Sequence, residues 1–245
     1  MKNWTHKNFL IHQFSEVEST NKTAFELVEA KKIFDHEVIL ADKQSAGKGR
    51  KSRLWSSPQG NLYFSLVLQP KISANKVTEI SFVAITALRL SIAALKTDLK
   101  IENKWPNDLL INEKKIAGLL LESKISHKNC EFIIVGIGLN IVSNPDQTIF
   151  PASNLKNFGI EISSEIALKN FLNEFENFYK NYLDFGFAGI RKLWLEKAFR
   201  LNEKISLKNN DEEISGIFSN LDEEGNLFLE TAEGVKKISA ADIYF

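Results

Sequence analysis

Residues 78–98, TEISFVAITALRLSIAALKTD, are apolar on nearly every side of the helix that they would form. Such a helix cannot face water along any stripe and has to be buried against a sheet. The apolar tract is interrupted by Thr86, Arg89 and Ser91, which favours a core helix over a membrane span. The rest of the chain must therefore supply a sheet that covers this helix.

Several apolar runs have the composition and bounds of strands. We predict strands at residues 37–43, 61–70, 100–105, 108–112, 114–123 and 130–141. Further helices are predicted at residues 19–32, 166–182 and 188–199, and the aromatic residues of the second are assigned to the core because they recur at helical spacing. Strands with interspersed helices up to about residue 142 indicate an α+β fold with a mixed sheet.

The sequence pattern changes at Asn202, where short predicted strands begin to alternate with turns and continue to the C-terminus. Hairpins of this kind predict a small β-barrel that packs on its neighbour, because a unit of this size buries little surface alone. The predicted domains are residues 1–200 and residues 201–245.

Composition excludes several classes of protein. Lysine plus arginine equals aspartate plus glutamate at 31 each, so no global field attracts the chain to nucleic acid or to a membrane. The single cysteine, Cys130, and the lack of a signal peptide lead us to expect a cytoplasmic protein. The four histidines are dispersed and suggest no metal site.

Residues 46–55, AGKGRKSRLW, place four cations and two glycines between two predicted strands. Backbone amides beside glycines, together with guanidinium groups, can cradle a phosphate. The spacing is not that of a P-loop, and a solvated turn remains an alternative. A second segment, KWPNDLL at 104–110, places a lysine at a strand end stiffened by Trp105 and Pro106, where its charge could be aimed at a developing oxyanion.

Together five segments are specific: STN at 19–21, QSAGKGRKSRLW at 44–55, KWPNDLL at 104–110, KKIAGLLLES at 114–123 and VGIGLN at 135–140. In order and spacing the chain closely resembles the biotin–protein ligases, from about Ser15 to the C-terminus. The resemblance implies a class II synthetase-like catalytic domain of the biotin–lipoate ligase fold, followed by a small SH3-like barrel.

The resemblance also implies a two-step reaction. The carboxylate of biotin attacks the α-phosphate of ATP, which gives biotinyl-5′-AMP and pyrophosphate, and a lysine of a biotin carboxyl carrier domain then displaces AMP. Mg²⁺ would accompany ATP, with no metal site built from protein groups. Fixed positive charge and positioning suit this chemistry better than a nucleophile of the enzyme.

The resemblance implies roles for the residues of the matched motifs. Lys104 would bridge the carboxylate and the α-phosphate, and Arg50 would hold the phosphate. The residues implied for biotin are Ser19, Thr20, Asn21, Gln44, Lys48, Gly49, Arg50, Lys104 and Gly118. Those implied for ATP and the adenylate are Gly47, Lys48, Arg50, Arg53, Trp55, Lys104, Asn107, Lys115 and Asn140. Helix capping is the alternative role of residues 19–21, and core packing that of Trp55.

Two positions depart from the common pattern of this loop, Gly-Arg-Gly-Arg-x-Gly-Arg. Lys48 replaces the first arginine and loses its two-pronged fork, and Ser52 replaces the last glycine, where a positive φ would be uncomfortable. Only 18 residues precede Ser19, fewer than the roughly 50 that a small DNA-binding domain needs, so we expect no DNA partner. The oligomeric state, a homodimer included, stays open.

Two other functions are compatible with parts of the sequence. A lipoate–protein ligase shares the fold and the chemistry, but KWPND favours biotin. A nucleic-acid-binding module could use GKGRKSR, but zero net charge and the lack of a known binding motif argue against it.

Overall fold

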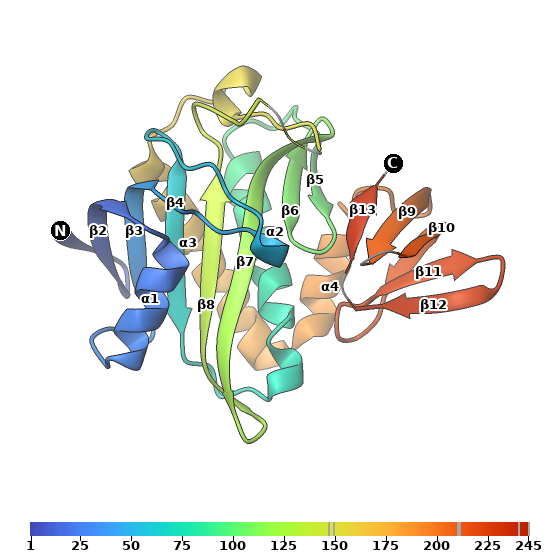
Figure 1. The fold of residues 1–245 in the computed structure, drawn as a ribbon, viewed down its shortest axis with the longest axis horizontal. Helices are drawn as coiled ribbons and strands as arrows, with labels where there is room; N and C mark the ends of the chain where they lie inside the picture. Colours follow the sequence, from blue (N-terminus) through green and yellow to red (C-terminus); the bar gives the residue numbers. More distant parts are fainter. Residues whose placement is uncertain (147, 149, 210–211, 240, 245) are drawn as a thin grey trace.

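A computed structural model describes residues 1–146, 148, 150–209, 212–239 and 241–244. Its larger part is an eight-stranded sheet in the order β1-β2-β3-β4-β8-β7-β6-β5 (Figure 1). The strands are β1 Lys2–His6, β2 Phe9–Val17, β3 Glu37–Gln44, β4 Leu62–Leu68, β5 Ile101–Lys104, β6 Asp108–Ile111, β7 Lys114–Ser126 and β8 Asn129–Leu139. β2 and β3 run parallel, whereas the other neighbouring pairs are antiparallel. The mixed sheet expected from the sequence is confirmed.

Helices cover both faces of this sheet. Helix α1, Thr20–Glu29, packs on β3, β4 and β8, while α2 Glu79–Ala93, α3 Ser164–Phe185 and α4 Phe187–Leu195 lie together on the opposite face (Figure 1). Strand β8 contributes side chains to both faces of the sheet, because side chains alternate along a strand. Phe132 and Ile134 belong to the apolar cluster under α1, and Ile133 and Val135 belong to the main core.

Helix α2 is the buried helix that the sequence predicts. Thirteen of its fifteen residues are buried, including Thr86, Arg89 and Ser91. Burial disfavours the charged form and lowers the pKa of the Arg89 guanidinium, although Glu196 partly offsets the effect. Within the described residues, no helix combines the length and the apolarity that crossing a bilayer requires.

Strands β1 and β2 were not predicted. They form a hairpin in which His6 pairs with Phe9, with Lys7 at φ +50 in the turn. Only Phe9 and Ile11 of β2 are fully buried, and the apolar Leu10 between them together with the mostly polar residues after them hides any alternation. The hairpin extends the sheet because β2 lies beside β3.

The C-terminal part is a five-stranded antiparallel sheet in the order β12-β11-β10-β9-β13, which fits an SH3-like unit. Its strands are β9 Lys204–Asn209, β10 Glu212–Leu221, β11 Leu227–Thr231, β12 Gly234–Ile238 and β13 Asp242–Tyr244. Its buried residues Leu207, Phe218 and Leu229 belong to the same apolar cluster as the main core. The expected packing of this small unit on its neighbour is therefore observed.

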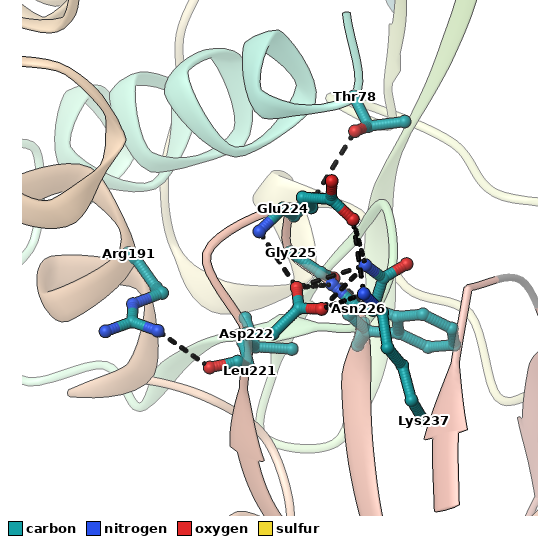
Figure 2. A network of polar contacts seen from close by, with 9 residues as sticks. Thr78, Arg191, Leu221, Asp222, Glu224, Gly225, Asn226 and Lys237 are labelled. Atoms are coloured by element: carbon teal, nitrogen blue, oxygen red, sulfur yellow. Dashed lines mark hydrogen bonds and ion pairs between the residues drawn. The ribbon is translucent and has the colours of Figure 1, made fainter. Parts of the chain in front are cut away.

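The turn between β10 and β11, Asp222–Asn226, is held by the carboxylate of Asp222 (Figure 2). Asp222 accepts hydrogen bonds from the amides of Glu224 (2.9 Å) and Asn226 (2.8 Å) and forms an ion pair with Lys237 at 2.6 Å. Burial alone would raise the pKa of Asp222, but the bonds to Lys237, to Asn226 and to the backbone outweigh it and lower the pKa to about 2.

We predict that Asp222→Asn lowers the free energy of unfolding by about 2 kcal/mol at pH 6. Because the folded pKa lies below the ordinary value, the carboxylate stabilises the fold fully above about pH 4, and this contribution is lost as the pH falls toward about 2. Urea unfolding of both proteins between pH 6 and pH 2 should show a difference that shrinks with acid. A difference that stays constant with pH would contradict this role.

Candidate active site

A cavity of about 440 Å³ lies on the α1 side of the large sheet, over β7 and β8. It brings together residues from several separate segments of the chain, including fourteen of the fifteen predicted from the sequence: Ser19, Thr20, Asn21, Gln44, Lys48, Gly49, Arg50, Arg53, Trp55, Lys104, Asn107, Lys115, Gly118 and Asn140. The fifteenth, Gly47, lies beside the lining, where a Cβ would come within 2.6 Å of Trp55 O and Ser57 Oγ.

The floor of the cavity is a patch of sheet without side chains. Gly118 on β7 pairs with Gly138 on β8, and Gly136 precedes Gly138 on the same face. A Cβ at Gly136 would lie 2.0 Å from Asn21 Oδ1, and one at Gly138 would lie 2.4 Å from Trp55 Nε1. Real Cβ atoms do not approach so closely, so these positions require glycine to let the two side chains reach the backbone.

One wall is the N-terminus of α1, where polar groups are already paired with one another. Gln44 Oε1 accepts from the backbone amide of Thr20 (2.8 Å), and Gln44 Nε2 donates to Ser57 Oγ (2.8 Å). Asn21 donates to Glu122 (2.8 Å), and Ser65 donates to Asn21 at 2.6 Å. Ser19 is the N-cap residue, but its side chain makes no capping hydrogen bond. The capping alternative therefore applies to Gln44 rather than to the Ser19 hydroxyl.

Residues 46–55, the cationic loop, fold back on themselves beside the cavity. Trp55 N donates to Gly47 O (2.9 Å) and Gly49 N donates to Arg53 O (2.7 Å), around a short 3₁₀ turn, Arg50–Ser52. Ser52 has φ +57, so the replacement of the usual glycine does place a side chain in the left-handed region. Arg50 Nη1 donates to Asn107 Oδ1 at 3.2 Å, which joins the loop to the segment after β5.

Two lysines of the large sheet also line the cavity. Lys104 ends β5, is buried, and holds its Nζ 3.2 Å from the ring centroid of Phe150, a cation–π contact. Lys115 forms an ion pair with Asp108 at 2.7 Å and lies 5.2 Å from the Trp55 ring. Ammonium and guanidinium groups on two walls make this a site for an anion. Among the described residues, no group of three or more metal-binding side chains occurs.

Asn140 lines the cavity and also holds the segment that follows β8. Its side-chain amide donates to Ser153 O at 3.0 Å, and its backbone carbonyl accepts from Leu155 N at 3.0 Å. It lines the cavity, but its donor group is used to hold the segment after β8.

Several lining or supporting residues were not predicted. They are Ser65, Asp108, Glu122, Gly136, Gly138, Phe150 and Ile243. A signal existed for the two glycines, because a Gly-x-Gly pair in a strand places both on one face. Phe150 and Ile243 come from distant segments, and only the tertiary fold brings them here.

We predict that Gly136→Ala lowers the free energy of unfolding by about 1–3 kcal/mol, since the new Cβ displaces Asn21 from a packed position. Gly189→Ala on α4 is the matched control, with nothing within 4 Å of its Cβ, and should raise stability by about 0.5–1 kcal/mol. Urea unfolding measures both. Equal effects of the two substitutions would show that the floor tolerates side chains.

We also predict that Ser52→Gly strengthens the closed loop, because glycine removes a left-handed cost of about 0.5–1 kcal/mol net of its own entropy. The protection of the Gly49 amide against hydrogen exchange should rise about 2- to 5-fold, given its bond to Arg53 O. The control Ser45→Gly, in the same connection but not at positive φ, should give no gain. Lower protection of the Gly49 amide in Ser52→Gly would refute the idea that the positive φ of Ser52 strains the loop.

Comparison with known proteins identifies the family. Residues 14–140 match the Biotin/lipoate A/B protein ligase family and residues 201–245 match the Biotin protein ligase C terminal domain. The bifunctional ligase/repressor BirA of Bacillus spizizenii is 36% identical over 96% of this chain and 73% of its own length. The biotin–[acetyl-CoA-carboxylase] ligase of Paracoccus denitrificans is 35% identical over 94% and 98%.

Comparison of the fold with solved structures supports the same family. The structure of a biotin protein ligase from Aquifex aeolicus in complex with biotin and ATP matches with a TM-score of 0.82 and 26% identity, over 96% of this chain and 97% of that one. The glycine floor and the surrounding cations therefore belong to a member of the biotin/lipoate protein ligase family.

Proposed function

We propose that this protein is an ATP-dependent biotin–protein ligase. It joins biotin and ATP to form biotinyl-5′-AMP and pyrophosphate, and then transfers biotin to a lysine of a biotin carboxyl carrier domain with release of AMP. The observation that carries the proposal is a single cavity that combines a glycine floor with the cations Arg50, Lys104 and Lys115. Relatives named as biotin ligases, and a similar structure described as bound to biotin and ATP, support it.

The first step brings two anions together. A carboxylate oxygen of biotin forms a bond to the α-phosphorus of ATP as the bond from that phosphorus to pyrophosphate breaks. Lys104, buried at a strand end, supplies a fixed positive charge between the two groups, and Arg50 supplies another from the loop. Charge placed before the reaction stabilises the transition state without reorganisation of solvent.

The second step needs no nucleophile from this protein. The neutral amine of the acceptor lysine attacks the acyl carbon of biotinyl-5′-AMP, and AMP leaves with the electron pair of the acyl–oxygen bond. The enzyme's part is to hold the adenylate in place. Trp55 lies over Gly118 and Gly138 and offers a flat face for the adenine, while the polar end of α1, Ser19 to Asn21, suits the ureido ring of biotin.

The remaining assignments follow the same division of the cavity. Gln44, Lys48, Gly49 and Gly118 are proposed for biotin, and Gly47, Arg53, Asn107, Lys115 and Asn140 for the nucleotide. Mg²⁺ fits as an ion carried by the phosphates, since Asp108 is the acidic residue of the lining and is already paired with Lys115. We also propose a cytoplasmic location and a carrier domain as the macromolecular partner.

Pyrophosphate exchange tests the function directly. Purified protein should exchange labelled pyrophosphate into ATP with biotin, and not with lipoate or without either acid. Exchange with lipoate would point to a lipoate ligase, and the absence of exchange from folded protein would refute the adenylation chemistry.

Lys104→Gln should lower the biotin-dependent exchange rate by about 100-fold, because it removes charge at the reacting groups while retaining much of the side-chain volume. Lys124→Gln is the control, since Lys124 is a half-exposed residue of β7 paired with Glu29 at 2.7 Å. This control should exchange at the wild-type rate. Equal rates in all three proteins would exclude Lys104 from catalysis.

A further inference from the structure

The β10–β11 turn, Asp222–Asn226, and the adjoining Leu221 contact the catalytic part at Thr78 and Arg191 (Figure 2). Gly225 O accepts a hydrogen bond from Trp105 Nε1 at 3.0 Å. On either side, Arg191 of α4 donates to Leu221 O at 2.9 Å and Thr78 donates to Glu224 O at 3.4 Å. The turn is thus anchored to α2, to α4 and to the residue that follows Lys104.

Gly225 is adapted to this contact. Its φ of +82 favours glycine, and a Cβ there would lie 2.4 Å from the ring of Phe82 on α2. The turn can therefore approach the core of the catalytic part only without a side chain at this position. Asp222 and Lys237 hold the turn in shape within its own sheet.

The residue before Lys104 is also held by a segment that leads into the C-terminal sheet. Asn103 N donates to Lys197 O and Phe199 N donates to Asn103 O, both at 2.8 Å, while Asn103 Nδ2 donates to Trp194 O at 3.0 Å. β5 is the edge strand of the large sheet, so this segment closes its outer side. Lys104 is bracketed by two fixed neighbours, one on each side.

We propose that the C-terminal sheet positions the reactive lysine: the hydrogen bond from Trp105 to Gly225 sets the backbone at Lys104 and so the direction of its ammonium group. Trp105 and Gly225 are positioning residues, because neither role requires contact with substrate. The inference rests on the proposed function, in which Lys104 acts on the carboxylate and the α-phosphate. The alternative to this positioning role is that the C-terminal sheet serves only to dock the carrier domain.

Steady-state pyrophosphate exchange, with kcat and KM for biotin and ATP, tests the proposal on full-length protein. Gly225→Ala should lower kcat on the order of 10-fold with both KM values within about twofold, because a misplaced lysine weakens the transition state more than the ground state. Gly234→Ala is the matched control. It has φ +116 at the start of β12 in the same sheet but nothing within 4 Å of its Cβ, so its kcat should stay at the wild-type value.

A second pair of variants covers the case in which Gly225→Ala does not fold. Trp105→Phe removes the indole N–H that bonds Gly225 O. Trp194→Phe removes the same volume from the same core at an indole N–H that has no hydrogen-bond partner among the described residues, and it keeps the backbone carbonyl that accepts from Asn103. Trp105→Phe should show the loss of kcat, and Trp194→Phe should show loss of thermal stability with kcat retained. The double variant Trp105→Phe/Gly225→Ala should lose no more than the larger single effect.

The outcomes distinguish a failure of this inference from a failure of the proposed function. Wild-type protein without biotin-dependent exchange would refute the proposed function and this role with it. An active wild type in which Gly225→Ala matches Gly234→Ala and Trp105→Phe matches Trp194→Phe would overturn the inference alone. So would a defect confined to transfer from preformed biotinyl-5′-AMP to the carrier domain, which would assign the C-terminal sheet to docking.

Discussion

The close approach of two side chains to bare backbone is the contact on which the rest of the site depends. Asn21 and Trp55 lie against the strand glycines 136 and 138, at distances where a methyl group on either glycine would overlap them. The missing side chains create a hollow on an otherwise covered sheet face, and the same two residues then wall it. Because the glycines let Asn21 and Trp55 lie close to the backbone, room is left above them for a ligand with an extended apolar chain and a polar head.

Charge completes the site locally, since the chain as a whole is neutral. Lys104 and Lys115 line the cavity from strands of the sheet, and Arg50 lines it from the loop. Lys115 forms an ion pair with Asp108, and the ammonium of Lys104 lies 3.2 Å from the ring centroid of Phe150. Both ammonium groups thus line the cavity from strands of the sheet, where their backbone is fixed.

Much of this arrangement could be predicted, because motif residues at strand ends and in glycine-rich turns carry local signals. The buried helix α2 was recognised from its apolar surface, and Arg50 and Lys104 from their motifs. The hairpin β1–β2 was missed because only two of its residues are fully buried. The contact of Gly225 with Trp105 could not be predicted, since a turn glycine in a sequence does not say which distant residue lies beside its carbonyl.

The crystal structure of the protein with biotinyl-5′-AMP would test the account most directly. We expect the ligand to lie against Asn21 and the Trp55 ring, above Gly118, Gly136 and Gly138, with the acyl phosphate within hydrogen-bond distance of Lys104 Nζ and with the Trp105–Gly225 bond intact. A ligand bound away from the glycine floor, or an acyl phosphate that Lys104 does not reach, would contradict it.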